Sequence, residues 1–337
     1  MQTQSSSRHR LAALSALPVL VLALAMAAGV ALALPGSWTY EWPKTDFSKH
    51  SVDLDEILSG GPPKDGIPSI DHPAFLPLSE VTDLPDREPV IGFQVGDDVR
   101  CYPLRILMWH EIVNDTVGGL PVAVTFCPLC NAAIVFDRRV DGRVLEFGTT
   151  GKLRFSDLVM YDRQTESWWQ QFLGEAIVGE MTGKTLKMLP ARIESFAKFR
   201  ERAPNGKVLV PDNLAARRYG MNPYVRYDSS SAPFLYRGDL NLPANVAPLH
   251  RLVTVDGEAW TLSLLRRDKT VETGDLVIRW EPDQASALDN PVIAEGFDVG
   301  NVTVQRKTEN GLEDVVYGVD FAFVFNAFYP DATIHTE

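Results

Sequence analysis

The sequence predicts a strand-dominated α+β fold made of two tandem copies of a related β-rich unit, the second worn and shortened. Short runs of β-branched and aromatic residues alternate with Gly- and Asp-containing turns, which is typical of β-hairpins. Helical apolar spacing is confined to brief stretches. Several segments recur later in the chain in the same order, which indicates a duplication. The 337 residues, 45% of them hydrophobic, are enough for about two domains.

The elements of the first unit follow from its turns. Gly96-Asp97-Asp98 separates two β-type runs and predicts a hairpin. Pro103 precedes helical spacing, and Gly118-Gly119 and Asp141-Gly142 mark further turns. In chain order we expect strands at 90–95 and 99–102, a helix at 104–112, a buried strand at 120–126, a strand pair at 132–137 and 143–147, a strand at 186–189 and a short helix at 195–202.

The internal repeat depends on three pairs of similar segments in the same order: 96–107 and 255–265, 135–142 and 304–311, 199–208 and 325–334. In this alignment Glu281 and Gln284 stand where the first copy has Cys127 and Cys130, and the counterpart of the segment around His110 has no histidine. Cysteines that served packing alone would be replaced by apolar residues. The comparison therefore favours a functional use of the cysteines in the first copy.

The N-terminus predicts export. Arg8, His9 and Arg10 precede an apolar run, Leu11–Leu34, and residues 31–33 fit a small-x-small cleavage site. The run is also long enough to span a bilayer. In both cases the rest of the chain lies on the periplasmic or extracellular face, with membrane contact only through this segment. The expected organisation is 1–35 signal peptide or N-terminal membrane anchor, 36–88 irregular Pro/Gly-rich arm, 89–210 first repeat, 211–249 linker and 250–337 second, degenerate repeat.

Charge and motifs exclude several classes of partner. The chain has 32 basic and 44 acidic residues and a net charge of -12, which argues against nucleic-acid binding. The segment Gly148–Leu153 lacks the spacing of a phosphate-binding loop, so no nucleotide cofactor is expected. The substrate is not indicated by any motif, and whether the protein is an enzyme stays open.

Cys127 and Cys130 in T-F-C-P-L-C-N are the most informative feature, because two of only three cysteines share one tight turn. A tetrahedral metal site needs further ligands, and the nearest histidine is His110, on the helix expected before this strand. We therefore predict Cys127, Cys130 and His110 as ligands of a soft transition metal, copper or zinc, with copper favoured outside the cytoplasm. A metallo-oxidoreductase is one form of this hypothesis.

Three other residues are candidates for a catalytic role. Glu111 follows His110 and could orient the imidazole or act as a base. Tyr161 and Arg163 lie in a segment that combines aromatic and polar side chains. This segment either forms a buried structural network or lines a substrate site beside the metal.

Two alternative uses of the cysteine pair remain. A dithiol–disulfide redox protein would use the same two residues, but an activated thiolate usually sits at a helix N-terminus. Here Asn131 leads into a strand-like run instead. The other alternative is a non-catalytic envelope binding module in which the pair forms a structural disulfide, which export permits.

The longer motifs resemble one family. C-Y-P-L-R-I-L-M-W-H-E-I-V-N-D, T-F-C-P-L-C-N-A-A-I-V-F-D-R, F-G-T-T-G-K-L, L-V-M-Y-D-R-Q-T-E-S-W-W-Q-Q and F-N-A-F-Y-P-D-A-T together are similar to domain of unknown function 3179, over roughly residues 80–337. The resemblance implies a fold unit and an extracytoplasmic location, and no activity. Cys101 stands where a small residue is expected and is not counted as a site residue.

Overall fold

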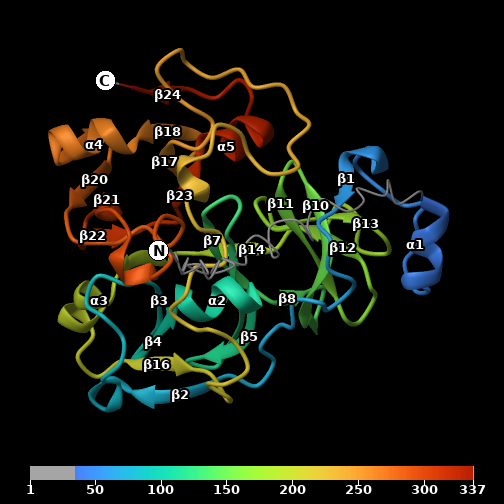
Figure 1. Cartoon of the computed structure of the whole chain (residues 1–337), viewed down its shortest axis with the longest axis horizontal. Coiled ribbons are helices and arrows are strands. Elements are labelled where there is room, and N and C mark those ends of the chain that lie inside the picture. Colours follow the sequence, from blue (N-terminus) through green and yellow to red (C-terminus); the bar gives the residue numbers. More distant parts are fainter. Residues whose placement is uncertain (1–34, 337) are drawn as a thin grey trace, which may run out of the picture. The chain divides into compact units, whose positions relative to one another are not determined.

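Strands account for 40% of this computed structural model and helices for 15%, and the small sheets take a five-blade propeller-like arrangement (Figure 1). The prediction of a strand-dominated fold is therefore confirmed. The structure describes residues 35–336, so the expected export segment 1–35 lies outside the described residues except for Pro35. Within the described part, no helix combines the length and hydropathy needed to cross a bilayer.

The first sheet contains the predicted hairpin. β3 (Pro89–Val95) and β4 (Asp98–Pro103) pair around a tight turn in which Gly96 has a φ of 57°. The strand order is β15-β3-β4-β16-β2, and β16 runs parallel to β4. The other members, with the helices that follow β4 and β15, are α2 (Leu104–His110), β2 (Ala74–Pro77), β15 (Arg192–Ser195), α3 (Phe196–Arg202) and β16 (Lys207–Val210).

The second sheet carries the cysteine turn and has the order β14-β7-β6-β5. Its strands are β5 (Ile112–Val117), β6 (Leu120–Cys127), β7 (Ala132–Asp137) and β14 (Lys187–Leu189). The expected pairing of 132–137 with 143–147 is wrong, because β7 lies between β6 and β14. The Asp141-Gly142 turn instead closes a two-stranded hairpin, β8 (Arg139–Val140) and β9 (Arg143–Val144).

The third sheet, in the order β1-β10-β11-β12-β13, was not predicted as a sheet. It joins a strand of the N-terminal arm to the aromatic segment around Trp168. Its members are β1 (Ile57–Ser59), β10 (Phe147–Arg154), β11 (Asp157–Asp162), β12 (Trp168–Gln170) and β13 (Glu175–Val178). The arm also holds α1 (Pro35–Glu41) and the 3₁₀ turns η1 (Leu54–Glu56) and η2 (Leu78–Glu80).

The C-terminal part of the chain forms two further sheets. The first has the order β23-β17-β18-β24 and the second the order β19-β20-β21-β22. Their elements are β17 (Arg251–Val255), β18 (Glu258–Thr261), α4 (Leu262–Asp268), β19 (Thr270–Thr273), β20 (Leu276–Glu281), β21 (Asn301–Thr308), β22 (Gly311–Asp314), β23 (Gly318–Phe321), α5 (Ala322–Phe328) and β24 (Ile334–His335). The 3₁₀ turns η3 (Tyr227–Ser229) and η4 (Ile293–Glu295) lie in connecting segments.

The chain has an N-terminal half, residues 35–210, which forms the first three sheets, and a C-terminal half, residues 251–336, which forms the last two. Their strand connections can be compared directly. β15-β3-β4-β16 and β23-β17-β18-β24 have the same order and the same strand directions. In both sheets a helix follows the hairpin and ends at a residue with positive φ, Glu111 at 56° and Lys269 at 63°. The predicted helix to Ile112 stops at His110 because Glu111 takes this conformation and β5 begins at the next residue.

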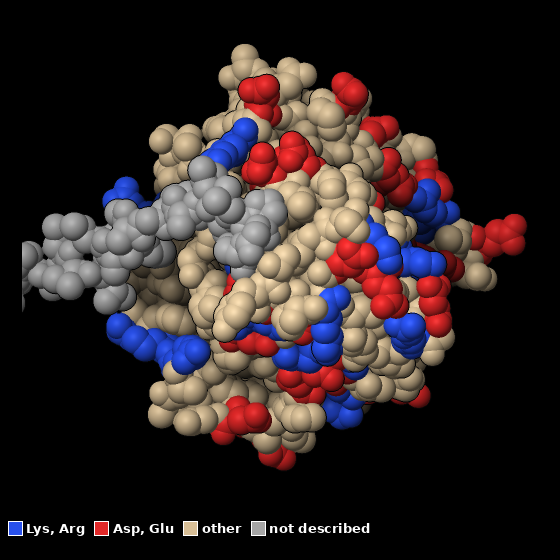
Figure 2. Space-filling model, turned by 90° about the vertical axis from the view of Figure 1, so that its right-hand side faces the viewer, with Lys and Arg blue, Asp and Glu red and all other residues tan. Residues whose placement is uncertain are grey.

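The arm is fixed to the third sheet by aromatic packing and ion pairs. Trp42 packs against Tyr161 and Trp168 with ring centroids 4.9 and 5.3 Å apart. On the face shown in Figure 2, basic and acidic side chains lie beside one another. Ion pairs between the arm and the rest of the chain include Lys64 with Glu166, Glu41 with Lys152, and Glu56 with Arg154. At least one side chain of each pair is largely buried, so these pairs hold the arm in a fixed position.

The two halves meet at the cysteine turn. The backbone N–H of Phe321 in β23 donates to the Cys130 carbonyl at 2.9 Å, and the Asn131 side-chain amide donates to the Val319 carbonyl at 2.6 Å. Phe126 and Phe321 belong to one buried apolar cluster that contains residues of both halves. The turn is therefore held from the C-terminal half as well as by its own hairpin.

We expect Asn131→Gly to destabilise the protein by about 1–3 kcal/mol, because a buried hydrogen bond is lost. Glycine keeps the positive φ of 54° at this position. Asn131→Ala adds a further penalty of about 1–2 kcal/mol for a left-handed alanine. Chemical denaturation measures both changes. Asp141→Gly, at an exposed turn residue with a φ of 50°, is the control and should change stability by less than about 0.5 kcal/mol. Wild-type stability in Asn131→Gly would contradict a stabilising contact at this turn.

Candidate metal centre

The β6–β7 hairpin brings both cysteine sulfurs to one side of the chain. Cys127 is the last residue of β6 and pairs with Ala132, the first residue of β7. Within the turn the Cys130 N–H donates to the Cys127 carbonyl at 3.2 Å, and Asn131 has a φ of 54°. Pro128 fixes φ inside this short connection. Both thiols are buried and free, so the pair is not a disulfide in this structure.

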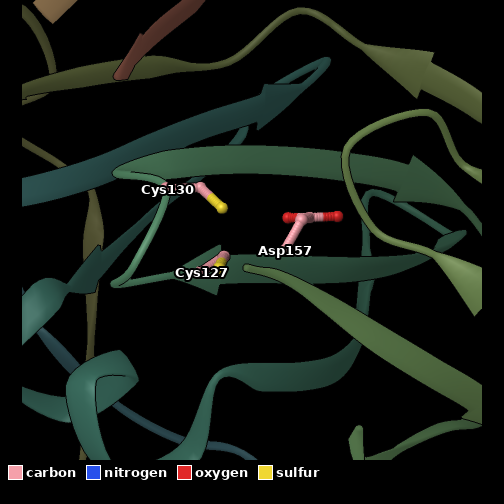
Figure 3. A group of neighbouring side chains, drawn as sticks. All are labelled: Cys127, Cys130 and Asp157. Carbon is pink, nitrogen blue, oxygen red and sulfur yellow. The ribbon is translucent and has the colours of Figure 1, made fainter. Parts of the chain in front are cut away.

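A second hairpin supplies a carboxylate to the same point. Phe155 and Ser156, with φ of 52° and 63°, form the two-residue turn between β10 and β11, and Asp157 follows as the first residue of β11. The ligand atoms of Cys127, Cys130 and Asp157 all lie within 4.8 Å of one another. Figure 3 shows the Cys130 sulfur pointing toward the Asp157 carboxylate.

The hydrogen bonds of these three side chains leave one carboxylate oxygen of Asp157 without a partner. Both thiols point to the Ser156 carbonyl, at 3.8 Å from Cys127 and 3.5 Å from Cys130. Asp157 Oδ2 accepts from Gln170 Nε2 at 2.5 Å and from the Phe172 N–H at 2.9 Å. The other oxygen, Oδ1, is buried and makes no hydrogen bond. An unpartnered buried oxygen costs free energy, so this position is suited to a ligand that binds oxygen.

The site is acidic and closed to solvent. Burial raises the pKa of Asp157 to about 6 and raises the pKa of both thiols. Burial and the charge of Asp157 raise the pKa of Glu111 to about 8. The charge of Glu111 in turn contributes to the raised pKa of the Cys127 thiol. Among the described residues no Lys, Arg or His forms an ion pair with Asp157 or Glu111. The raised pKa values keep Glu111 and the thiols protonated at neutral pH, whereas Asp157 is ionised there and has no cationic side chain beside it among the described residues.

The segment expected to be a linker covers this group. Tyr224 and Tyr227 pack against the buried cluster, and burial raises the pKa of each phenol, with further contributions from Glu111 and Cys127 at Tyr224 and from both cysteines at Tyr227. The Ser156 hydroxyl donates to the Phe234 carbonyl, and the Phe234 N–H donates to the Tyr227 hydroxyl at 3.2 Å. Residues 224–234 thus close the site from the side of the β10–β11 turn.

His110 does not belong to the three-residue group. Its Nδ1 is 2.8 Å from the Pro68 carbonyl and its Nε2 is 2.9 Å from the Tyr219 hydroxyl, so both ring nitrogens already have partners. The positive φ at Glu111 turns the chain at the helix end. The charge of the Glu111 carboxyl, and not the His110 imidazole, contributes to the raised pKa of Cys127. The group that the structure brings together thus contains Asp157 with the two cysteines, and the predicted His110 lies outside it.

Tyr161 and Arg163 serve a different contact. Tyr161 lies four residues after Asp157 along β11, roughly 13 Å at about 3.3 Å per residue. Its hydroxyl donates to Asp65 at 2.6 Å, and Arg163 forms ion pairs with Asp65 and Asp71 of the arm. These two residues attach the arm to the third sheet.

A family model described as "Protein of unknown function (DUF3179)" matches residues 64–332 of the chain. Neither the curated proteins nor the solved structures contain a significant match.

We expect the stability of metal-free protein to fall as the pH rises from about 4.5 to about 8. The folded chain holds the Glu111 proton up to its pKa of about 8, whereas an ordinary glutamate releases it near 4.5. Folding therefore binds a proton within this range and is most favoured at its acidic end. Glu111→Gln should remove on the order of 4 kcal/mol of this pH dependence. Denaturant titrations at several pH values test it, with exposed Glu201→Gln as control. An unchanged slope in Glu111→Gln would exclude this origin.

Proposed function

The chain belongs to the DUF3179 family, which is defined without an activity, and we propose that it is a metal-binding protein that holds one soft or borderline transition metal ion between Cys127, Cys130 and Asp157. The observation that carries this proposal is the absence of any counter-charge beside these buried acidic groups in the described chain. A divalent cation would deprotonate the thiols, bind the unpartnered Oδ1 of Asp157 and offset the burial of negative charge.

The donor set favours zinc over copper. Thiolate sulfur and carboxylate oxygen are both zinc ligands in proteins, whereas the copper hypothesis relied on the imidazole of His110. Zinc–sulfur bonds near 2.3 Å place two thiolates roughly 4 Å apart, which is compatible with ligand atoms that lie within 4.8 Å of one another. Three protein ligands leave a fourth position. Glu111 is not a member of the group whose ligand atoms lie within 4.8 Å of one another, so it would have to approach the ion to fill this position; its carboxyl, which acts on the pKa of Cys127, also suits it to accept a proton from a water bound there.

A dithiol–disulfide protein is the second candidate. The observation that favours it is Asp157 itself, a carboxyl with a pKa of about 6 beside both thiols, which is a suitable base for their deprotonation. Three features weigh against it: the thiols are buried, their pKa values are raised, and Cys130 leads into strand β7 and not into a helix. Reaction with an external disulfide would require residues 224–234 to move away.

We also infer that the two halves arose by duplication. The shared strand order, the helix ends at Glu111 and Lys269, and the parallel final strands support it. At the positions of Cys127 and Cys130, the second half has exposed Glu281, paired with Lys198, and buried Gln284. The second half would then serve to support the site of the first.

The location of the protein is part of the same proposal. The basic and then apolar N-terminal sequence supports export, with the folded part on the periplasmic or extracellular face. The net charge of -12 supports a partner other than nucleic acid. Outside the cytoplasm, metal binding would also keep the free thiols from oxidising.

We expect the full chain, purified and loaded with Zn²⁺, to retain about one equivalent of metal after dialysis. Cys127→Ser, Cys130→Ser and Asp157→Asn should each weaken binding by at least about 100-fold, because each removes a ligand. Elemental analysis and competition with a chromophoric chelator measure these effects. Co²⁺ substitution should also give thiolate-to-metal charge-transfer bands that are lost in both cysteine variants.

Two matched controls separate a metal site from general damage. Cys101→Ala removes the buried thiol that lies outside the group, and His110→Ala removes the imidazole, so both should retain one equivalent. Glu111→Gln decides the fourth position: loss of affinity indicates a ligand, and unchanged affinity indicates a proton acceptor. If the wild-type chain binds no metal and its two thiols titrate freely against a disulfide reagent, the dithiol candidate takes its place.

A further inference from the structure

A cavity of about 260 Å³ lies between the two halves of the chain. One wall comes from β7 and β14 of the second sheet, and the other from the β17–β18 hairpin, β23 and α5. Apolar side chains dominate it, including Ile134, Phe172, Met188 and Phe325. It is smaller than the roughly 300–1,000 Å³ typical of pockets for drug-sized ligands, so any ligand must be small.

Asp320 gives this cavity a single buried acid. The residue is 2% exposed yet lines the cavity, and its only hydrogen-bond donor in the described structure is the Thr254 hydroxyl, 2.7 Å from Oδ2. No Lys, Arg or His among residues 35–336 lines the cavity, while Asp256 at the β17–β18 turn already pairs with Arg306. A buried carboxylate without a cation is costly, and a cationic ligand would remove this cost.

The surroundings of Asp320 are built for this arrangement. Gly318 lies under the carboxylate, and a Cβ at this position would collide with Asp320 and come within 2.6 Å of the Thr254 hydroxyl. The space for the acid is therefore created by a glycine. Tyr329 also lines the cavity. Aromatic faces attract cations.

We propose that this cavity binds a small organic cation, an ammonium group on an apolar or aromatic body, with Asp320 as its counter-ion. The ammonium group donates to Asp320, and the apolar body contacts Phe172, Met188 and Phe325. Asp320 is not one of the proposed metal ligands, although Phe172 contributes both to this cavity and, through its backbone N–H, to Asp157.

The test uses the full chain labelled with ¹³C at the methionine methyl groups and treated with chelator. Met188 lines the cavity, and its resonance is assigned with Met188→Leu. The probes are butylamine and 2-phenylethylamine, each compared with the alcohol of the same carbon skeleton. We expect saturable shifts of the Met188 methyl with the amines, and at least about tenfold weaker binding of the alcohols, because the charge-assisted bond is absent.

Asp320→Asn should weaken amine binding by at least about tenfold, whereas Asp256→Asn at the rim should leave it unchanged. Leu189→Trp fills the cavity and keeps Asp320, so loss of binding in this variant tests the location even if Asp320→Asn folds poorly. The proposal is overturned if amines and alcohols bind equally, if Asp256→Asn has the larger effect, or if no amine shifts Met188.

Discussion

Two hydrogen bonds between the cysteine turn and strand β23 join the N-terminal and C-terminal halves of the fold. Because Phe321 donates to Cys130 and Asn131 donates to Val319, β23 is held against the β6–β7 hairpin. Phe321, the donor of the first bond, contacts the cysteine turn. The preceding residue, Asp320, lines the cavity between the two halves. A strand of the second half thus fixes the position of a site whose side chains all belong to the first.

Three short, constrained turns then assemble the candidate metal centre. The Cys127–Cys130 turn places two thiols, the Phe155-Ser156 turn precedes the Asp157 carboxyl, and the positive φ at Glu111 places a second carboxyl. None of these residues is far from a strand or helix end, so their positions depend on the register of the sheets. The sheets therefore hold the carboxyl and thiol groups in place, although no Lys, Arg or His of the described residues forms an ion pair with Asp157 or Glu111.

The hairpin 90–102, the helix after Pro103 and the cysteine strand could be predicted because turn residues and apolar spacing are local signals. The third sheet could not, since it pairs residues 57–59 of the arm with 152–154, and sequence spacing carries no information on such distant contacts. The same limit explains why His110 and not Asp157 was predicted as the third member of the candidate site. His110 is near the cysteines in sequence, whereas Asp157 reaches them through a separate hairpin. One signal was present: Asp157 is an ionisable residue at the start of the apolar run Leu158–Tyr161.

Because residues 224–234 cover the site, the time for which a bound ion stays would depend on how often this segment opens. With the thiols and Asp157 almost fully buried, and with the Ser156–Phe234–Tyr227 contacts across them, exchange with solvent requires that segment to open. Residence time would then follow the opening rate and not the affinity of the ligands. The metal present when the chain folds would be retained kinetically, so the compartment in which folding occurs would decide the identity of the ion.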